Sequence, residues 1–203
     1  APGQPVVSGF SGVLPPAAPP AGSDPLDYTF IDPDGPSMAI QQLQPEGPPV
    51  GQLIAAPPVF TAKASDVGQT FGVALDNAPE LTGAAAPNIY LAATSAFGLN
   101  IVVPDAEGNP VRSRLGDPAA TFMPGQWGSA DGATGYPGSI WKVDGTTGEI
   151  SLFTTIAANT GAGLGSLVYD PATAQFFVSD LDTGLIYRLS TDGIIIDTYD
   201  HGT

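Results

Sequence analysis

Carboxylates are almost the only side chains in this chain that could act as acids, bases or metal ligands. The 203 residues include 20 Asp and Glu, five Lys and Arg, one His and no Cys, and the formal net charge is −15. The missing Cys excludes disulfides, thiol nucleophiles and iron–sulfur clusters, and the single His excludes a His-rich metal centre. Carboxylates with so few counter-charges suit divalent-cation sites or an exported acidic surface.

Nucleophilic catalysis has little support in the sequence. His201 is the one imidazole that could serve a Ser as general base, but it lies near the chain end and no Gly-x-Ser-x-Gly motif is present. The Gly-rich run 161–165 lacks the spacing of a nucleotide-binding loop. Glycoside hydrolysis needs only two carboxylates and stays open, because nothing selects a pair.

The charge also restricts the partners. A chain with this negative charge repels the phosphate backbones of nucleic acids. We therefore expect no nucleic-acid binding. No apolar run reaches the ~18–20 residues of a membrane span, so we expect no membrane insertion. The opening Ala1-Pro2-Gly3 is typical of a mature N-terminus after signal-peptide removal, which predicts a secreted or periplasmic protein; the alternative is an arbitrary boundary.

A change in composition near residue 58 divides the chain. Fourteen of the 22 prolines lie in residues 1–58, which contain no Lys or Arg. Because Pro fixes φ and lacks an N–H, this part is predicted to be an extended arm without a regular strand ladder. Its spaced apolar residues favour an ordered arm that packs on the blades or on another subunit; the alternative is a flexible spacer. The expected anchors are Tyr28, Phe30, Ile40 and Leu53.

Residues 59–203 have an all-β pattern of short β-branched and aromatic runs between turns. The clearest part, 164–199, predicts a four-stranded antiparallel meander with Leu185, Tyr187 and Leu189 on one face, against a neighbouring sheet. The same pattern fits about 71–156, with a long insertion at roughly 95–138. There we expect Trp141 and Phe153 to be buried between the two units.

These units resemble a known family. The segments GSIWKVDGTTGEISLF and GLGSLVYDPATAQFFVSDLDTGLIYRLSTDG are similar to blades of the NHL, SMP-30 and YVTN-like bacterial β-propellers. The resemblance implies two visible propeller-like blades, about 71–156 and 164–199. It also resembles the N-terminal part of large secreted bacterial proteins. Two blades cannot close a ring, so either further blades or another cover for the open edges is expected.

The SMP-30-like resemblance implies a metal site as one hypothesis. Those propellers are lactonases or esterases that hold a divalent cation with carboxylate and amide ligands. The matching strand ends here carry Asp76, Asn77, Asp170 and Asp180, whose oxygens would suit Ca²⁺. The simpler interpretation is that they form Asx turns, and no cofactor is then required. Residues 105–109 also fail the EF-hand pattern and indicate a turn.

The insertion has the composition of an interaction surface. Its aromatic and basic residues include Arg112, Arg114, Phe122 and Trp127. The alternative is a loop folded onto its own blade. The sequence therefore favours an exported, non-enzymatic structural or interaction module of a larger envelope or extracellular assembly, with a protein partner or self-association. A metal-dependent lactonase or esterase, and a carbohydrate-binding adhesin that stacks sugars on Trp127, Tyr136 and Trp141, are the rival hypotheses.

Overall fold

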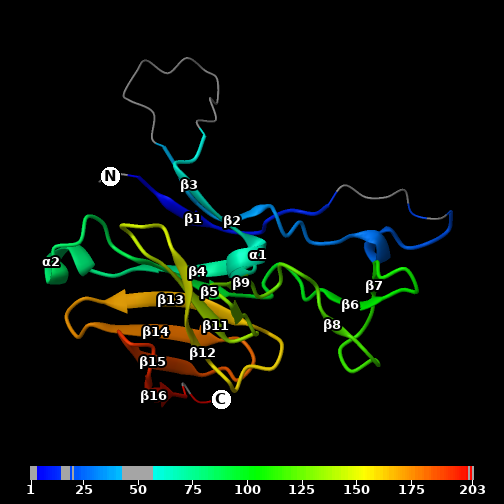
Figure 1. Cartoon of the computed structure of the whole chain (residues 1–203). Coiled ribbons are helices and arrows are strands. Elements are labelled where there is room, and N and C mark those ends of the chain that lie inside the picture. Colours follow the sequence, from blue (N-terminus) through cyan, green and yellow to red (C-terminus); the bar gives the residue numbers. More distant parts are fainter. Residues whose placement is uncertain (1–3, 15–18, 20, 43–56, 201, 203) are drawn as a thin grey trace, which may run out of the picture.

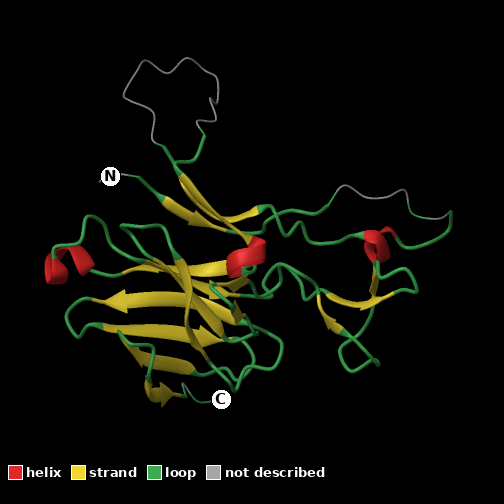
Figure 2. Cartoon of the chain, viewed as in Figure 1, coloured by secondary structure: helices red, strands yellow, loops and turns green. Residues whose placement is uncertain are grey.

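The chain folds mainly into antiparallel β-sheets, as predicted (Figure 2). The computed structural model describes residues 4–14, 19, 21–42, 57–200 and 202. Two four-stranded sheets form the centre, with the strand orders β12-β11-β5-β4 and β13-β14-β15-β16. The strands of this first sheet are β4 (Thr70–Leu75), β5 (Ile89–Ala93), β11 (Ser139–Val143) and β12 (Ile150–Thr155). Those of the second sheet are β13 (Leu164–Asp170), β14 (Gln175–Asp180), β15 (Ile186–Ser190) and β16 (Ile195–Tyr199).

The second sheet is the meander that the sequence predicts. Its four strands pair in chain order, and Gly184 and Gly193 supply positive φ in two of the turns. Tyr187 and Leu189 are buried in the core between the two sheets, and Leu185 packs against that core. The predicted face of β15 is therefore confirmed.

The two central sheets pack face to face through an aromatic cluster. The Tyr90 ring of the first sheet lies 4.3 Å from Phe176 of the second and 4.9 Å from Phe153, centroid to centroid. The backbones of the two sheets approach each other closely where β4 meets β13. A Cβ added to Gly72 of β4 would lie only 2.4 Å from the carbonyl oxygen of Gly165 in β13. Phe153 thus packs between the sheets, as expected.

A third sheet covers the other face of the first sheet. It consists of β1 (Val6–Ser8), β2 (Pro36–Ile40) and β3 (Phe60–Lys63), paired in that order. This N-terminal sheet corrects the prediction that the proline-rich arm forms no regular ladder, and it joins residues from both sides of the predicted boundary near 58. The prolines lie around the strands, and Pro36 occupies the first position of β2, where a missing N–H is tolerated.

Trp141 belongs to this second interface. Its side chain is fully buried, but among Met38, Leu91 and other residues between the first and N-terminal sheets. The expectation that it lies between the two four-stranded sheets is wrong. Ile140 of β11 pairs with Thr154 of β12, but the next residue, Trp141, pairs with Leu152, so Phe153 is an extra residue in β12. Phe153 therefore faces one neighbouring sheet and Trp141 faces the other.

The insertion folds into two parts beside this stack. A three-stranded sheet, in the order β7-β6-β8, contains β6 (Ile101–Pro104), β7 (Pro110–Arg112) and β8 (Thr121–Phe122). The hairpin of β9 (Ser129–Ala130) and β10 (Ala133–Thr134) follows. The short helices are η1 (Pro25–Tyr28), α1 (Ala64–Val67) and α2 (Ala78–Thr82). Figure 1 shows β6–β8 and η1 to one side of the stacked sheets.

The described strands form separate sheets that close no ring or barrel. The fold is therefore all-β with stacked antiparallel sheets, and the interpretation of the two central sheets as propeller blades stays a prediction. In the part of the chain that the structure describes, no helix is long and apolar enough to cross a membrane.

Candidate interaction site

Three of the four predicted metal ligands lie at one end of the central interface, where they hold turns and side chains of the protein. The Asp76 carboxylate accepts hydrogen bonds from the backbone N–H groups of Ala78 and Asn88, and from the Tyr90 hydroxyl at 3.2 Å. The Tyr169 hydroxyl donates to the side-chain oxygen of Asn77. These oxygens already have partners, as in the Asx-turn alternative.

Asp170 and Asp180 sit at opposite ends of the pair β13 and β14. Asp170 pairs with Gln175 at one end, and Asp180 pairs with Leu164 at the other. The four predicted ligands therefore do not converge on one ion, because Asp180 is separated from the other three by the length of a strand. Among the described residues, no group of three or more His, Asp or Glu side chains is arranged to hold a metal.

Asp180 is the most buried of these carboxylates, with 2% of its surface exposed. One oxygen accepts hydrogen bonds from the Asn159 amide and from the Asp182 backbone N–H. The other oxygen is buried and has no protein hydrogen-bond partner. Burying such an atom is costly, but one carboxylate alone does not define a metal site.

The predicted arm anchors pack on the protein's own chain. Ile40 lies against the core between the N-terminal and first sheets, and Phe30 packs against the small core of Ile31, Ala64, Val102 and Met123. Tyr28 is half-buried at the end of η1, which lies against β7. Leu53 lies outside the described residues. This part of the arm is thus ordered on the sheets and on the insertion.

The insertion residues differ in their accessibility. Trp127 is 4% exposed, and its backbone oxygen accepts a hydrogen bond from the Trp141 indole at 2.9 Å. Arg112 is half-buried and donates to the side-chain oxygen of Asn100, whereas Arg114 is exposed. The segment around Trp127 therefore folds onto the first sheet, as the alternative interpretation proposed. Because Trp141 is fully buried, it cannot stack on a sugar.

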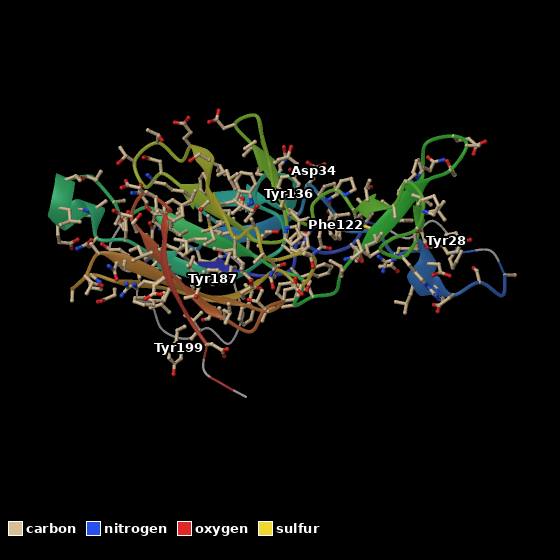
Figure 3. The ribbon with its side chains drawn as sticks, turned by 90° about the horizontal axis from the view of Figure 1, so that it is seen from below. Tyr28, Asp34, Phe122, Tyr136, Tyr187 and Tyr199 are labelled. Atoms are coloured by element: carbon tan, nitrogen blue, oxygen red, sulfur yellow. The ribbon has the colours of Figure 1, made fainter. Side chains whose placement is uncertain are left out.

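Phe122 and Tyr136 border two adjoining hollows on the surface of the insertion. A hollow of about 590 Å³ is lined by Phe122, Met123, Pro124, Trp127, Tyr136 and several glycine and hydroxyl residues. A second hollow, of about 380 Å³, is lined by residues that include Phe122, Tyr136, Pro137, Thr155 and Asn159. Phe122 and Trp127 stack edge to face at 5.3 Å. Tyr136 is 58% exposed. Figure 3 labels Phe122 and Tyr136 near the middle of the molecule, away from Tyr28.

The outer face of the second sheet is a surface that the sequence analysis did not single out. Val168, Phe177, Arg188 and Asp197 form one row across its four strands, opposite in the pleat to the buried residues. Phe177, Arg188 and Asp197 surround a shallow hollow together with Ile186 and Tyr199, and the Arg188 guanidinium lies 3.7 Å from the Asp197 carboxylate. The edge strand β16 is exposed along its whole length. The alternation of buried and exposed residues along β13 and β15 was the sequence signal that could have indicated this surface.

This row has a counterpart in the first sheet that is covered. By register, Ala74, Tyr90, Lys142 and Ser151 occupy the same positions in β4, β5, β11 and β12. Tyr90 matches Phe177, and Lys142 matches Arg188. The side of the first sheet that carries this row packs on the second sheet through Ala74 and Tyr90. The outer face of the second sheet thus corresponds to the side of the first sheet that packs on the second sheet, but no sheet covers it among the described residues.

Comparison with protein-family models, with curated proteins and with solved structures found no match. The resemblance to NHL and SMP-30-like propellers accordingly stays a prediction from the quoted segments.

Proposed function

We propose that the protein is a non-enzymatic structural module of an exported assembly, and that it associates with a second copy of itself through the outer face of its second sheet. The observation that carries the proposal is the row Val168, Phe177, Arg188 and Asp197, which repeats the arrangement of a covered face. Apolar sheet faces of this kind are normally buried against another layer.

A second copy suits this face because the face is self-complementary. It carries both a base, Arg188, and an acid, Asp197, beside the apolar Phe177 and Ile186. A twofold axis that passes between Arg188 and Asp197 would bring each Arg close to the Asp of the other copy. The exposed β16, with Tyr199 62% exposed, lies at the edge of the same face.

The experiment is sedimentation velocity over a concentration series. We expect the wild type to show a concentration-dependent dimer, and Val168→Lys to be monomeric, because a buried unpaired charge opposes association. Val168 is 56% exposed, so the monomer should keep its fold. Leu81→Lys, at a 63% exposed position in α2, is the matched control and should dimerise like the wild type.

Two results would contradict the proposal: a wild type that stays monomeric at every concentration, or equal dimerisation of both variants. Salt gives a further check. Two copies with a net charge of −15 repel each other, so screening by added salt should strengthen an association that rests on apolar burial.

The lactonase or esterase hypothesis has no comparable support. Asp76, Asn77 and Asp170 are bound in turns or to Tyr169, and Asp180 lies at the other end of the sheet. A rise in melting temperature on addition of Ca²⁺, together with lactone or ester hydrolysis, would favour it over the structural role.

A further inference from the structure

We propose that the two hollows bordered by Phe122 and Tyr136 form a binding groove for a proline-rich segment in the polyproline II conformation. This site is separate from the outer face of the second sheet and shares no lining residue with the hollow there. Three features of the groove favour such a ligand: its shape, its aromatic lining and an unpaired hydrogen-bond donor.

The shape suits an extended ligand. Both Phe122 and Tyr136 line both hollows, so the two depressions adjoin along an aromatic border. A polyproline II helix repeats every three residues with a rise of about 3.1 Å per residue, so prolines on one side of it enter neighbouring depressions. Grooves between aromatic rings are the usual receptors of such segments.

The lining suits proline rings. Pro124 and Trp127 extend the apolar wall of the larger hollow, and Pro137 that of the smaller. Tyr136 exposes 58% of its surface, so its ring can contact a ligand without a rearrangement of the fold. A polyproline II segment has little conformational freedom to lose on binding, which favours it over a flexible peptide.

The Trp127 indole is a donor without a partner. Its Nε1 is buried and makes no hydrogen bond within the protein, although the side chain lines the larger hollow. A polyproline II backbone makes no internal hydrogen bonds, so its carbonyl oxygens are available as acceptors. A carbonyl of the bound segment could satisfy the N–H, which is otherwise a costly buried group.

The same lining disfavours a sugar. The larger hollow has no carboxylate or amide side chain among its lining residues, and its Ser129 hydroxyl donates to the Ala133 carbonyl oxygen. In the smaller hollow, the Asn159 amide is already bound to Gly163 and Asp180. The polar side chains left to a sugar in the larger hollow are hydroxyls, such as those of Thr121 and Thr134, and no charged or amide group there would hold it.

The test uses a synthetic peptide, Leu-Pro-Pro-Ala-Ala-Pro-Pro, titrated into the full chain by calorimetry and by Trp fluorescence. The chain's own sequence contains this heptapeptide at residues 14–20, so neighbouring copies would supply it. We expect saturable binding, weakened about tenfold or more in Tyr136→Ala, because that change removes an exposed aromatic wall. Trp127→Phe should weaken binding while keeping the aromatic ring.

Two controls separate this site from the proposed dimer face. Val168→Lys should bind the peptide like the wild type, and Tyr136→Ala should keep the wild-type oligomeric state and melting temperature. A peptide with every Pro replaced by Ala should not bind. The proposal is overturned by no binding of the heptapeptide, by unchanged binding in Tyr136→Ala, or by equal binding of the Ala peptide. Tyr136-dependent binding of a linear hexasaccharide in its place would assign the groove to carbohydrate.

Discussion

Aspartates at the strand ends act as turn formers in this protein. The Asp144 carboxylate accepts hydrogen bonds from the backbone N–H groups of Thr146 and Thr147, both at 2.8 Å, and Asp170 accepts from Ala172 and Thr173. The Thr147 N–H holds the pKa of Asp144 below its ordinary value, and the Thr173 hydroxyl does the same for the pKa of Asp170. Both metal ligation and turn formation use Asp at these positions, so the sequence alone could not separate them.

At the same scale, Tyr90 should make stability sensitive to alkaline pH. Burial, and next the charge of Asp76, raise the pKa of the Tyr90 phenol above its ordinary value of 10.0. Above about pH 10 the unfolded chain loses this proton while the folded protein keeps it, so stability should fall as the pH rises. Thermal melts between about pH 8 and 11 should show a shallower decline for Tyr90→Phe than for the wild type.

Tyr136→Phe is the control for this prediction, because the Tyr136 side chain is exposed on the surface. Its melting temperature should follow the wild-type pH profile. If Tyr90→Phe declined as steeply as the wild type, burial of Tyr90 would not be the source of the alkaline sensitivity. Tyr169, whose pKa is also raised by burial, would then be the next residue to test.

At the scale of elements, the sequence predicted the strands that are continuous and locally paired. All four strands of the second sheet follow from their alternation and their turns. The strands β1 and β2 were missed because residues 1–58 are rich in proline as a whole. The two short strands themselves contain a single proline, Pro36, at the start of β2. The opposite directions of Trp141 and Phe153 were missed because the extra residue that β12 has against β11 leaves no mark in the sequence.

The outer face of the second sheet and the two hollows beside Phe122 and Tyr136 were likewise predictable only in part. The alternation of Val168 with its buried neighbours was readable from the sequence, and so was the aromatic content of the insertion. The equivalence of the outer face to a covered face depends on pairing across strands, and the meeting of Phe122 with Tyr136 depends on how the insertion folds back. Neither is a local property of the chain.

The contact between β4 and β13 should tolerate no side chain at Gly72. Its Cβ would lie 2.4 Å from the Gly165 carbonyl oxygen and 2.7 Å from the Leu167 nitrogen, so the sheets would have to separate. We expect Gly72→Ala to cost about 1–3 kcal/mol in the free energy of unfolding. Gly9→Ala, where a Cβ meets no atom within 4 Å, should change it little. Chemical denaturation of both variants gives the comparison, and equal stabilities would mean that the sheets do not approach so closely.

At the scale of the whole molecule, the stack of sheets has a direction. Leu91 and Trp141 of the first sheet face the N-terminal sheet, and Val178 and Tyr187 occupy the matching positions in the second sheet and face the first. Each central sheet therefore uses the same side to contact the layer before it. The N-terminal sheet ends the stack on one side, and the outer face of the second sheet leaves it open on the other.

Deletion of residues 1–57 removes β1 and β2, two of the three strands of the N-terminal sheet. It would expose Trp141, Leu91 and other fully buried side chains, so we expect a marked fall in melting temperature and a tendency to associate through the uncovered face. Calorimetry and light scattering measure both. An unchanged melting temperature and mass would mean that the arm adds nothing to the stability of the sheets.

The insertion between β5 and β11 has a consequence for the order of events during folding. The second sheet can form by successive closures of short hairpins, whereas the first must wait until residues 94–138 bring β11 back to β5. Closing longer loops is slower, so the second sheet should appear early and offer its apolar side as a template for the first. Pulse-labelling hydrogen exchange would then protect Val178 and Leu189 before Leu91. A nascent chain leaving the ribosome would therefore complete its first sheet only after the strands of the second sheet had emerged.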